Sequence, residues 1–178
     1  MSRSILSGRN KVRAYLGLGG NLGDPQAAMA TALAMLDAAD GIAVVRVSSL
    51  YRTPPWGLID QPDFLNAVAE VETGLSPRRL LAACLDAELA LKRVRTERWG
   101  PRAIDLDVLI YGDLAIHEDG LTIPHPRIAE RAFVLVPLLE ISPALAMDGQ
   151  PLSHALTSLD TGGIVRLDLP ADWWRVAP

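Results

Sequence analysis

Length, composition and charge place this chain among globular proteins of ordinary size. Its 178 residues suffice for one domain with a hydrophobic core, and 49% apolar with 21% charged residues excludes a disordered chain. No apolar run reaches the ~18–20 residues of a membrane helix, and the net charge of −4 argues against a general nucleic-acid binder. The stretch from Met1 to Lys11 lacks the apolar centre of a signal peptide, so we expect a cytoplasmic protein with a loose extension over residues 1–11. We expect the single cysteine, Cys84, to pack in the core of a domain spanning residues 12–178.

The first part of the chain predicts a strand, a helix and a β-rich segment. Val12 to Leu18 is a strand candidate that runs into glycines. Asp24 can cap a helix that has Pro25 at its first position, and Gly41 ends that helix. Apolar residues recur between these ends at helical spacing: Ala28, Ala32, Leu33, Leu36 and Ala39. Ile42 to Arg52 is rich in β-forming residues.

The next elements complete a recognisable order. A rigid loop, Thr53-Pro54-Pro55-Trp56-Gly57, leads to the alternating strand Phe64 to Glu72. Ser76-Pro77 begins a second helix, and Ala103 to Tyr111 alternates again as a strand. The order strand, helix, strand, strand, helix, strand predicts an α+β, ferredoxin-like split βαβ sandwich with both helices on one face of a largely antiparallel sheet. From about Leu114 to Pro178 we expect short elements that wrap onto this domain.

Four glycines early in the chain have two interpretations. Gly17, Gly19, Gly20 and Gly23 could form a nucleotide-binding loop, but they lack the Gly-Lys-Ser/Thr ending of a P-loop and the third glycine of a dinucleotide motif. A tight turn from strand to helix is the interpretation that we prefer.

Asp105 and Asp107 are the candidate metal ligands. Residues two apart in a strand share a face, and Ile104, Leu106, Val108 and Ile110 would occupy the other face. Two neighbouring carboxylates repel each other unless a cation lies between them, and hard oxygen ligands suit Mg²⁺. The same pattern also fits an ordinary exposed strand face.

A basic cluster directly upstream favours the metal interpretation. Lys92, Arg93, Arg95, Arg98 and Arg102 fall within eleven residues and are opposed only by Glu97. Guanidinium groups bind phosphate oxygens, and a carboxylate pair beside arginines is the arrangement that phosphoryl transfer requires. The pattern therefore indicates a nucleotide-polyphosphate site, although a solvated basic loop would look similar.

Three further positions have both a structural and a functional interpretation. Glu88 lies along the apolar stripe of the second helix, where it could orient a ligand or simply extend its carboxylate to water. Phe64 and Asn66 share a strand face and could bind a flat polar heterocycle, or could be a core ring and an edge amide. His125, between two prolines, could contact a phosphate.

Several segments together resemble the 6-hydroxymethyl-7,8-dihydropterin pyrophosphokinase family of folate synthesis. They occur in family order between about Val12 and Leu145: Leu18-Gly19-Gly20-Asn21-Leu22-Gly23, Tyr51-Arg52-Thr53-Pro54-Pro55, Phe64-Leu65-Asn66, Arg98-Trp99-Gly100-Pro101-Arg102, Ile104-Asp105-Leu106-Asp107 and Ile123-Pro124-His125-Pro126-Arg127. The stretch Arg-Trp-Gly-Pro-Arg followed by Asp-Leu-Asp is the most specific of these. Trp56 stands where the family commonly has an aliphatic residue, and Phe64 where it often has tyrosine.

The resemblance implies a reaction and a set of site residues. The hydroxymethyl oxygen of the pterin would attack the β-phosphorus of ATP, and AMP would leave. Asp105 and Asp107 would bind two Mg²⁺ ions, and Arg93 and Arg102 would stabilise the transferring phosphates. The resemblance places Thr53, Pro54, Trp56, Phe64, Asn66 and Phe133 around the pterin, with the two phenylalanine rings stacked on its two faces. It places Glu88, Arg95, Trp99, Thr122, His125 and Arg131 around ATP.

The expected partners are therefore ATP and 6-hydroxymethyl-7,8-dihydropterin, bound by a monomer, with no nucleic acid and no membrane. One alternative is a ferredoxin-like module that senses a nucleotide without turnover, which the clustered acids and arginines argue against. Another is an RNA-binding domain on the same fold, which the acidic balance and the lack of an aromatic RNA-binding strand make a poor fit.

Overall fold

An antiparallel sheet forms the centre of the computed structural model, which describes residues 10–55, 60–91 and 103–175. Its strands are β1 (Val12–Gly20), β2 (Ile42–Val47), β3 (Tyr51–Thr53), β4 (Phe64–Thr73), β5 (Asp105–Tyr111) and β10 (Val165–Arg166). They lie in the order β10-β3-β4-β1-β5, with β2 also paired to β4. The expected segment from Ile42 to Arg52 thus forms two strands that both pair with β4. Between them, the Ser48 backbone N–H donates to Val68 O, and the Val68 backbone N–H donates to Ser48 Oγ. This order, with helices between the strands, confirms the predicted α+β arrangement.

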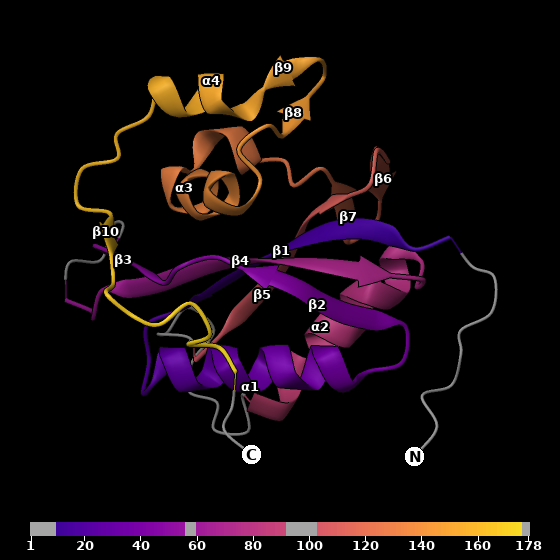
Figure 1. Cartoon of the computed structure of the whole chain (residues 1–178), viewed down its shortest axis with the longest axis horizontal. Helices are drawn as coiled ribbons and strands as arrows, with labels where there is room; N and C mark the ends of the chain where they lie inside the picture. Colours follow the sequence, from indigo (N-terminus) through magenta and orange to yellow (C-terminus); the bar gives the residue numbers. More distant parts are fainter. Residues whose placement is uncertain (1–9, 56–59, 92–102, 176–178) are drawn as a thin grey trace.

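The two predicted helices cover one face of the sheet (Figure 1). They are α1 (Pro25–Ala38) and α2 (Pro77–Leu91). The Asp24 side chain accepts a hydrogen bond from the Ala27 backbone N–H at 3.0 Å, so it caps α1 as expected. Leu33 and Cys84, both fully buried, belong to the core between these helices and the sheet, as predicted for Cys84.

A third helix covers the opposite face, and the sequence patterns had indicated only short elements there. This helix is α3 (Ala132–Ile141); it follows the short 3₁₀ turn η1 (Ile128–Glu130) and precedes α4 (Leu152–Thr157) in the upper layer of Figure 1. A second core of buried side chains, including Leu135 and Leu138, fills the space between α3 and the sheet. The helix was hard to predict because its sequence is apolar almost all round, which leaves no 3.6-residue pattern.

The predicted side of Ile110, near the end of β5, is wrong. Val108 pairs with Leu16, but Ile110 pairs with Tyr15, so the register shifts between these two pairs. A β-bulge inserts one extra residue and reverses which side the next side chains occupy. Ile110 therefore packs in the core under α3 with Tyr15, and not with Ile104 on the α1 and α2 side.

The remaining elements are two small hairpins and a C-terminal segment. The hairpins are β6 (Ile116–Glu118) with β7 (Leu121–Ile123), and β8 (Ala146–Met147) with β9 (Gln150–Pro151). The chain then returns to the sheet, where β10 pairs with β3 and Trp174, only 8% exposed, joins the α1 and α2 core.

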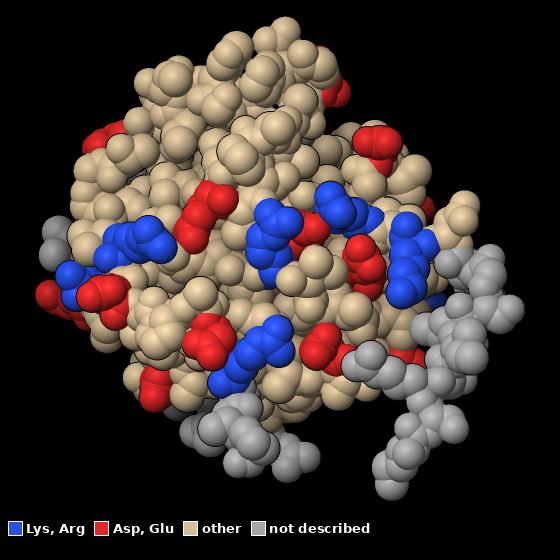
Figure 2. Space-filling view, viewed as in Figure 1, with Lys and Arg blue, Asp and Glu red and all other residues tan. Residues whose placement is uncertain are grey.

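The described surface shows mixed charge. On the face shown in Figure 2, acidic and basic side chains are interspersed across the middle of the molecule. Within the described ranges, no helix combines the length and the apolar character needed to cross a membrane.

Candidate active site

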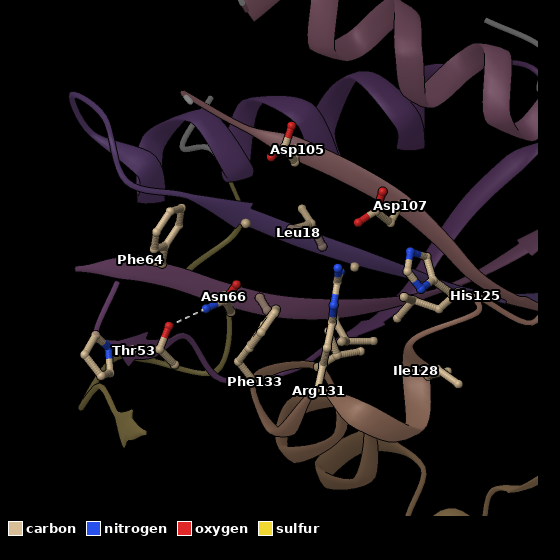
Figure 3. Close-up of a pocket in the computed structure, with 17 residues that line it drawn as sticks. Leu18, Thr53, Phe64, Asn66, Asp105, Asp107, His125, Ile128, Arg131 and Phe133 are labelled. Atoms are coloured by element: carbon tan, nitrogen blue, oxygen red, sulfur yellow. Dashed lines mark hydrogen bonds between the residues drawn. The ribbon is translucent and has the colours of Figure 1, made fainter. Parts of the chain in front are cut away.

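A pocket of about 280 Å³ lies between the sheet and the N-terminal end of α3 (Figure 3). Strands β1, β4 and β5 form its floor, while the end of β3 and the segment from His125 to Val134 form its walls. The residues that line it are Gly17, Leu18, Gly19, Thr53, Pro54, Phe64, Asn66, Ala67, Val68, Asp105, Asp107, Leu109, His125, Ile128, Arg131, Phe133 and Val134.

Two glycines of β1 lie between the acidic strand and the amide-bearing strand. Gly19 pairs with Asp105 on one side and with Asn66 on the other. Gly17 pairs in the same way with Asp107 and Val68. Paired residues in an antiparallel sheet present side chains to the same face, so the missing side chains leave a shallow floor between the two groups.

This placement corrects the interpretation of the early glycines as a turn. Gly17 and Gly19 are inside β1, which extends to Gly20, and only Gly23, with a φ of 63°, takes the left-handed conformation of a turn. A Cβ atom at Gly19 would lie 3.1 Å from Asn66 Oδ1, which is closer than side chains normally approach. Glycine at this position is therefore explained by the space that Asn66 occupies.

The acidic side of the pocket is formed by β5. Asp105 is half-buried and Asp107 is exposed, and Figure 3 shows both carboxylates on the pocket side of the strand. At the outer edge of β5, Glu88 Oε1 of α2 accepts a hydrogen bond from the Leu106 backbone N–H at 2.6 Å. Glu88 therefore holds the strand segment between the two aspartates, and it is not among the residues that line the pocket.

The opposite side combines an amide with two aromatic rings. Asn66, 8% exposed, donates from Nδ2 to Thr53 Oγ1 at 2.9 Å, which fixes the orientation of the amide. Phe64 on β4 and Phe133 on α3 are both half-buried and both line the pocket. This side can offer hydrogen bonds and flat apolar surface to a planar heterocycle.

His125 and Arg131 reach the pocket from the segment that precedes α3. The His125 backbone N–H donates to Leu109 O at 2.8 Å, and His125 Nδ1 accepts from the Arg127 N–H at 3.1 Å, so the neutral ring carries its proton on Nε2. Burial, opposed by the Asp107 carboxylate and aided by Arg131 and Arg127, lowers the pKa of His125. The Arg131 guanidinium lies 5.7 Å from the centroid of the Phe133 ring, within cation–π range.

The structure brings together most of the residues that the resemblance selected. Those that line the pocket are Thr53, Pro54, Phe64, Asn66, Asp105, Asp107, His125, Arg131 and Phe133. Glu88 and Thr122 do not line it; Thr122 lies on β7, paired with His117. Trp56, Arg93, Arg95, Trp99 and Arg102 fall outside the described residues.

Sequence reasoning missed the apolar lining. Leu109 follows Asp105 and Asp107 at the same two-residue spacing, so the strand alternation itself could have identified it. Ile128 and Val134 line the pocket because η1 and α3 pack across the sheet, and no local pattern contains that information.

Comparison with known proteins identifies similar chains. A family model described as 7,8-dihydro-6-hydroxymethylpterin-pyrophosphokinase (HPPK) matches residues 15–143, which is more than half of the chain. A 2-amino-4-hydroxy-6-hydroxymethyldihydropteridine pyrophosphokinase of Methylorubrum extorquens is 52% identical over 156 residues, which cover 88% of this chain and 99% of that protein. The Haemophilus influenzae protein of the same name is 43% identical over 148 residues, covering 83% and 91% of the two chains.

Longer proteins contain a similar part. The wild-type HPPK-DHPS structure of Plasmodium falciparum gives a TM-score of 0.66 at 16% identity, covering 85% of this chain and 45% of that one. The chain thus spans less than half of that solved protein, and at this identity the likeness shows the fold alone.

Proposed function

This chain belongs to the 7,8-dihydro-6-hydroxymethylpterin-pyrophosphokinase family, which transfers diphosphate from ATP to hydroxymethyldihydropterin in folate synthesis, and we propose that the pocket under α3 is its active site. One observation carries this proposal. The β1 glycines place the carboxylates of β5 and the Asn66 amide of β4 on opposite sides of one open floor. A phosphate-binding side and a heterocycle-binding side then meet where a bond must form between the two substrates.

The pterin would occupy the amide side of the pocket. Phe64 and Phe133 would pack against its two ring faces, and Asn66, held by Thr53, would hydrogen-bond its polar edge. Pro54 would close the outer wall. A polar group that is already oriented loses little entropy on binding, so this arrangement favours selective binding of the heterocycle.

The ATP phosphates would lie over β5. Asp105 and Asp107 offer hard oxygen donors on one strand face, which fits Mg²⁺ when phosphate oxygens complete its coordination. Two protein carboxylates leave further positions around Mg²⁺, which phosphate oxygens and water can fill. Two bound Mg²⁺ ions would neutralise the triphosphate and align its oxygens.

The reaction then needs positioning more than covalent chemistry by the protein. The pterin hydroxymethyl oxygen bonds to the β-phosphorus and releases its proton to solvent. The bond from that phosphorus to the bridging oxygen of the α-phosphate breaks, and AMP leaves with that oxygen. The His125 Nε2–H and the Arg131 guanidinium can donate to phosphate oxygens beside Asp107. Arg93 and Arg102 keep the predicted role of stabilising the transferring phosphates. The packed ring and the held phosphates bring the reacting atoms together.

We further propose that the chain works as a monomer in the cytoplasm. The alternative of a nucleotide sensor without turnover conflicts with the family membership.

The site assignment is tested by Asn66→Ala. We expect weaker pterin binding by about 1–3 kcal/mol, the usual cost of leaving a buried polar group without its partner, and unchanged binding of a non-hydrolysable ATP analogue. Titration calorimetry with each ligand measures both values. Thr31→Ala is a matched control, because it removes a side-chain hydrogen bond to Ala27 O on α1, outside the pocket. Unchanged pterin affinity in Asn66→Ala would refute this layout.

A further inference from the structure

Glu140, near the end of α3, joins that helix to the strand beside the pocket. Its Oε2 accepts a hydrogen bond from the Tyr51 hydroxyl at 2.5 Å. Its Oε1 accepts two more, from the Ser49 backbone N–H at 3.0 Å and from the Ser49 hydroxyl at 2.7 Å. An exposed glutamate usually reaches water, whereas this one makes three charge-assisted contacts to a single segment.

Both ends of this connection belong to elements that form walls of the pocket. Tyr51 and Thr53 are two residues apart on β3, so they share the face that α3 covers. Phe133 and Glu140 are seven residues apart on α3, which is two helical turns on one side of the helix. A shift between α3 and β3 would therefore change the spacing between Phe133 and the Thr53–Asn66 pair.

The C-terminal segment supports the same strand from its other side. β10 pairs with β3, Val165 with Arg52 and Arg166 with Tyr51. Arg166 Nε donates to the Ser49 hydroxyl oxygen at 2.8 Å, so Ser49 is held by both Arg166 and Glu140. This segment lies beyond residues 15–143, the part of the chain that the family model matches.

The Tyr51 hydroxyl keeps its proton in the contact with Glu140. Burial, followed by the hydrogen bond and the charge of Glu140, raises the pKa of the Tyr51 hydroxyl well above its usual range. The hydroxyl therefore stays a donor at neutral pH and well above it. The three contacts hold α3 and the segment from Ser49 to Tyr51 together.

From these contacts we infer that Glu140 is a positioning residue for pterin binding: through Tyr51 and Ser49 it sets the distance between the α3 wall and the β3 wall. The inference rests on the proposed function, because it assumes that one ring face of the pterin packs on Phe133 while its polar edge bonds to the Asn66 amide that Thr53 holds. Glu140 is not among the pocket-lining residues, so it acts through the two elements that it joins.

The test uses Glu140→Ala and Tyr51→Phe in the full chain. We expect Glu140→Ala to raise the dissociation constant of the pterin about tenfold and Tyr51→Phe, which removes one of the three contacts, to raise it about threefold, with the KM for ATP within about twofold in both. The double variant should bind the pterin as Glu140→Ala does, because Glu140→Ala already removes the contact to Tyr51. Arg78→Ala is the matched control, since it removes an exposed ion pair between Arg78 on α2 and Glu118 on β6, outside the pocket.

Thermal melts separate positioning from stability. If Glu140→Ala lowers the melting temperature but leaves pterin affinity unchanged well below that temperature, Glu140 is merely structural and the inference is wrong. Should Glu140→Ala fail to fold, Tyr51→Phe decides, because it removes one hydroxyl and keeps the ring.

Asn66→Ala distinguishes the two proposals: if it weakens pterin binding and the Glu140 and Tyr51 variants do not, only this inference fails. If none of the three variants weakens pterin binding, the layout of the pocket is wrong and the inference fails with it.

Discussion

Asp105 and Asp107 share a strand face but differ in exposure, half-buried against exposed. Because Asp107 is the more exposed of the two, it is the better residue with which to test a role in the site. An exposed carboxylate contributes little to folding, so its removal tests function without a large loss of stability.

Asp107→Ala should therefore reduce AMP formation by about a hundredfold or more while the protein stays folded, as expected when a group that organises the charged transition state is lost. The assay is AMP release from ATP with saturating pterin and Mg²⁺, beside a urea unfolding curve. Asp86→Ala, an exposed aspartate on α2, is the control and should retain normal turnover. Near-normal turnover of Asp107→Ala at saturating Mg²⁺ would exclude Asp107 as a ligand.

Cys84 gives a prediction about reactivity. The side chain is fully buried, and burial, together with the charges of Glu88 and Asp107, raises the pKa of its thiol to about 12. Since the thiolate is the reactive form, a thiol reagent at pH 8 should label the native protein only as fast as it unfolds. Labelling followed by mass spectrometry across a urea series checks this. Complete labelling of the native protein within minutes would contradict the burial of this side chain.

At the scale of elements, β1 shapes the pocket floor through the missing side chains at Gly17 and Gly19. Its glycines separate the acidic strand from the amide strand, and the neighbours of the two glycines differ. A Cβ atom at Gly19 would lie 3.1 Å from Asn66 Oδ1, whereas one at Gly17 would meet Leu109 at an ordinary 3.4 Å.

Gly19→Ala should therefore displace the Asn66 amide and weaken pterin binding more than Gly17→Ala does. We expect a loss of about 1–3 kcal/mol for Gly19→Ala, because the amide can no longer satisfy both Thr53 and the ligand. Pterin titrations of the two variants, with circular dichroism to verify folding, provide the comparison. Equal pterin affinities of the two variants would mean that the position of the Asn66 amide does not depend on the absence of a side chain at Gly19.

For the whole molecule, the C-terminal segment closes the core. Trp174 is 8% exposed and packs in the core between the sheet and α1, and the Trp173 Nε1–H donates to Ser48 O at 2.9 Å. The last described residues thus cover apolar surface of elements far earlier in the chain.

Trp174→Ala should lower the free energy of unfolding by roughly 3–5 kcal/mol, the usual cost of truncating a large buried ring. Chemical denaturation measures this value, and Asp172→Ala, an exposed neighbour, should change it by less than about 0.5 kcal/mol. A loss below about 1 kcal/mol would show that the segment detaches without cost to the core.

The sequence alone determined the elements whose patterns are local. Alternation and capping predicted β1, β4, β5, α1 and α2, because period and chain ends are properties of neighbouring residues. The same period predicted that Asp105 and Asp107 share a face. It failed at Ile110, where a bulge set by pairing with β1 reversed the side.

Tertiary structure alone decided how the site closes. Phe133 and Arg131 were expected through resemblance to a family and not through any period, because α3 is apolar almost all round. Their place opposite Asn66 depends on a helix packed across the sheet, and Glu140 meets Tyr51 across 89 positions of sequence. Contacts over such separations depend on how whole elements pack, and the order of neighbouring residues does not encode that packing locally.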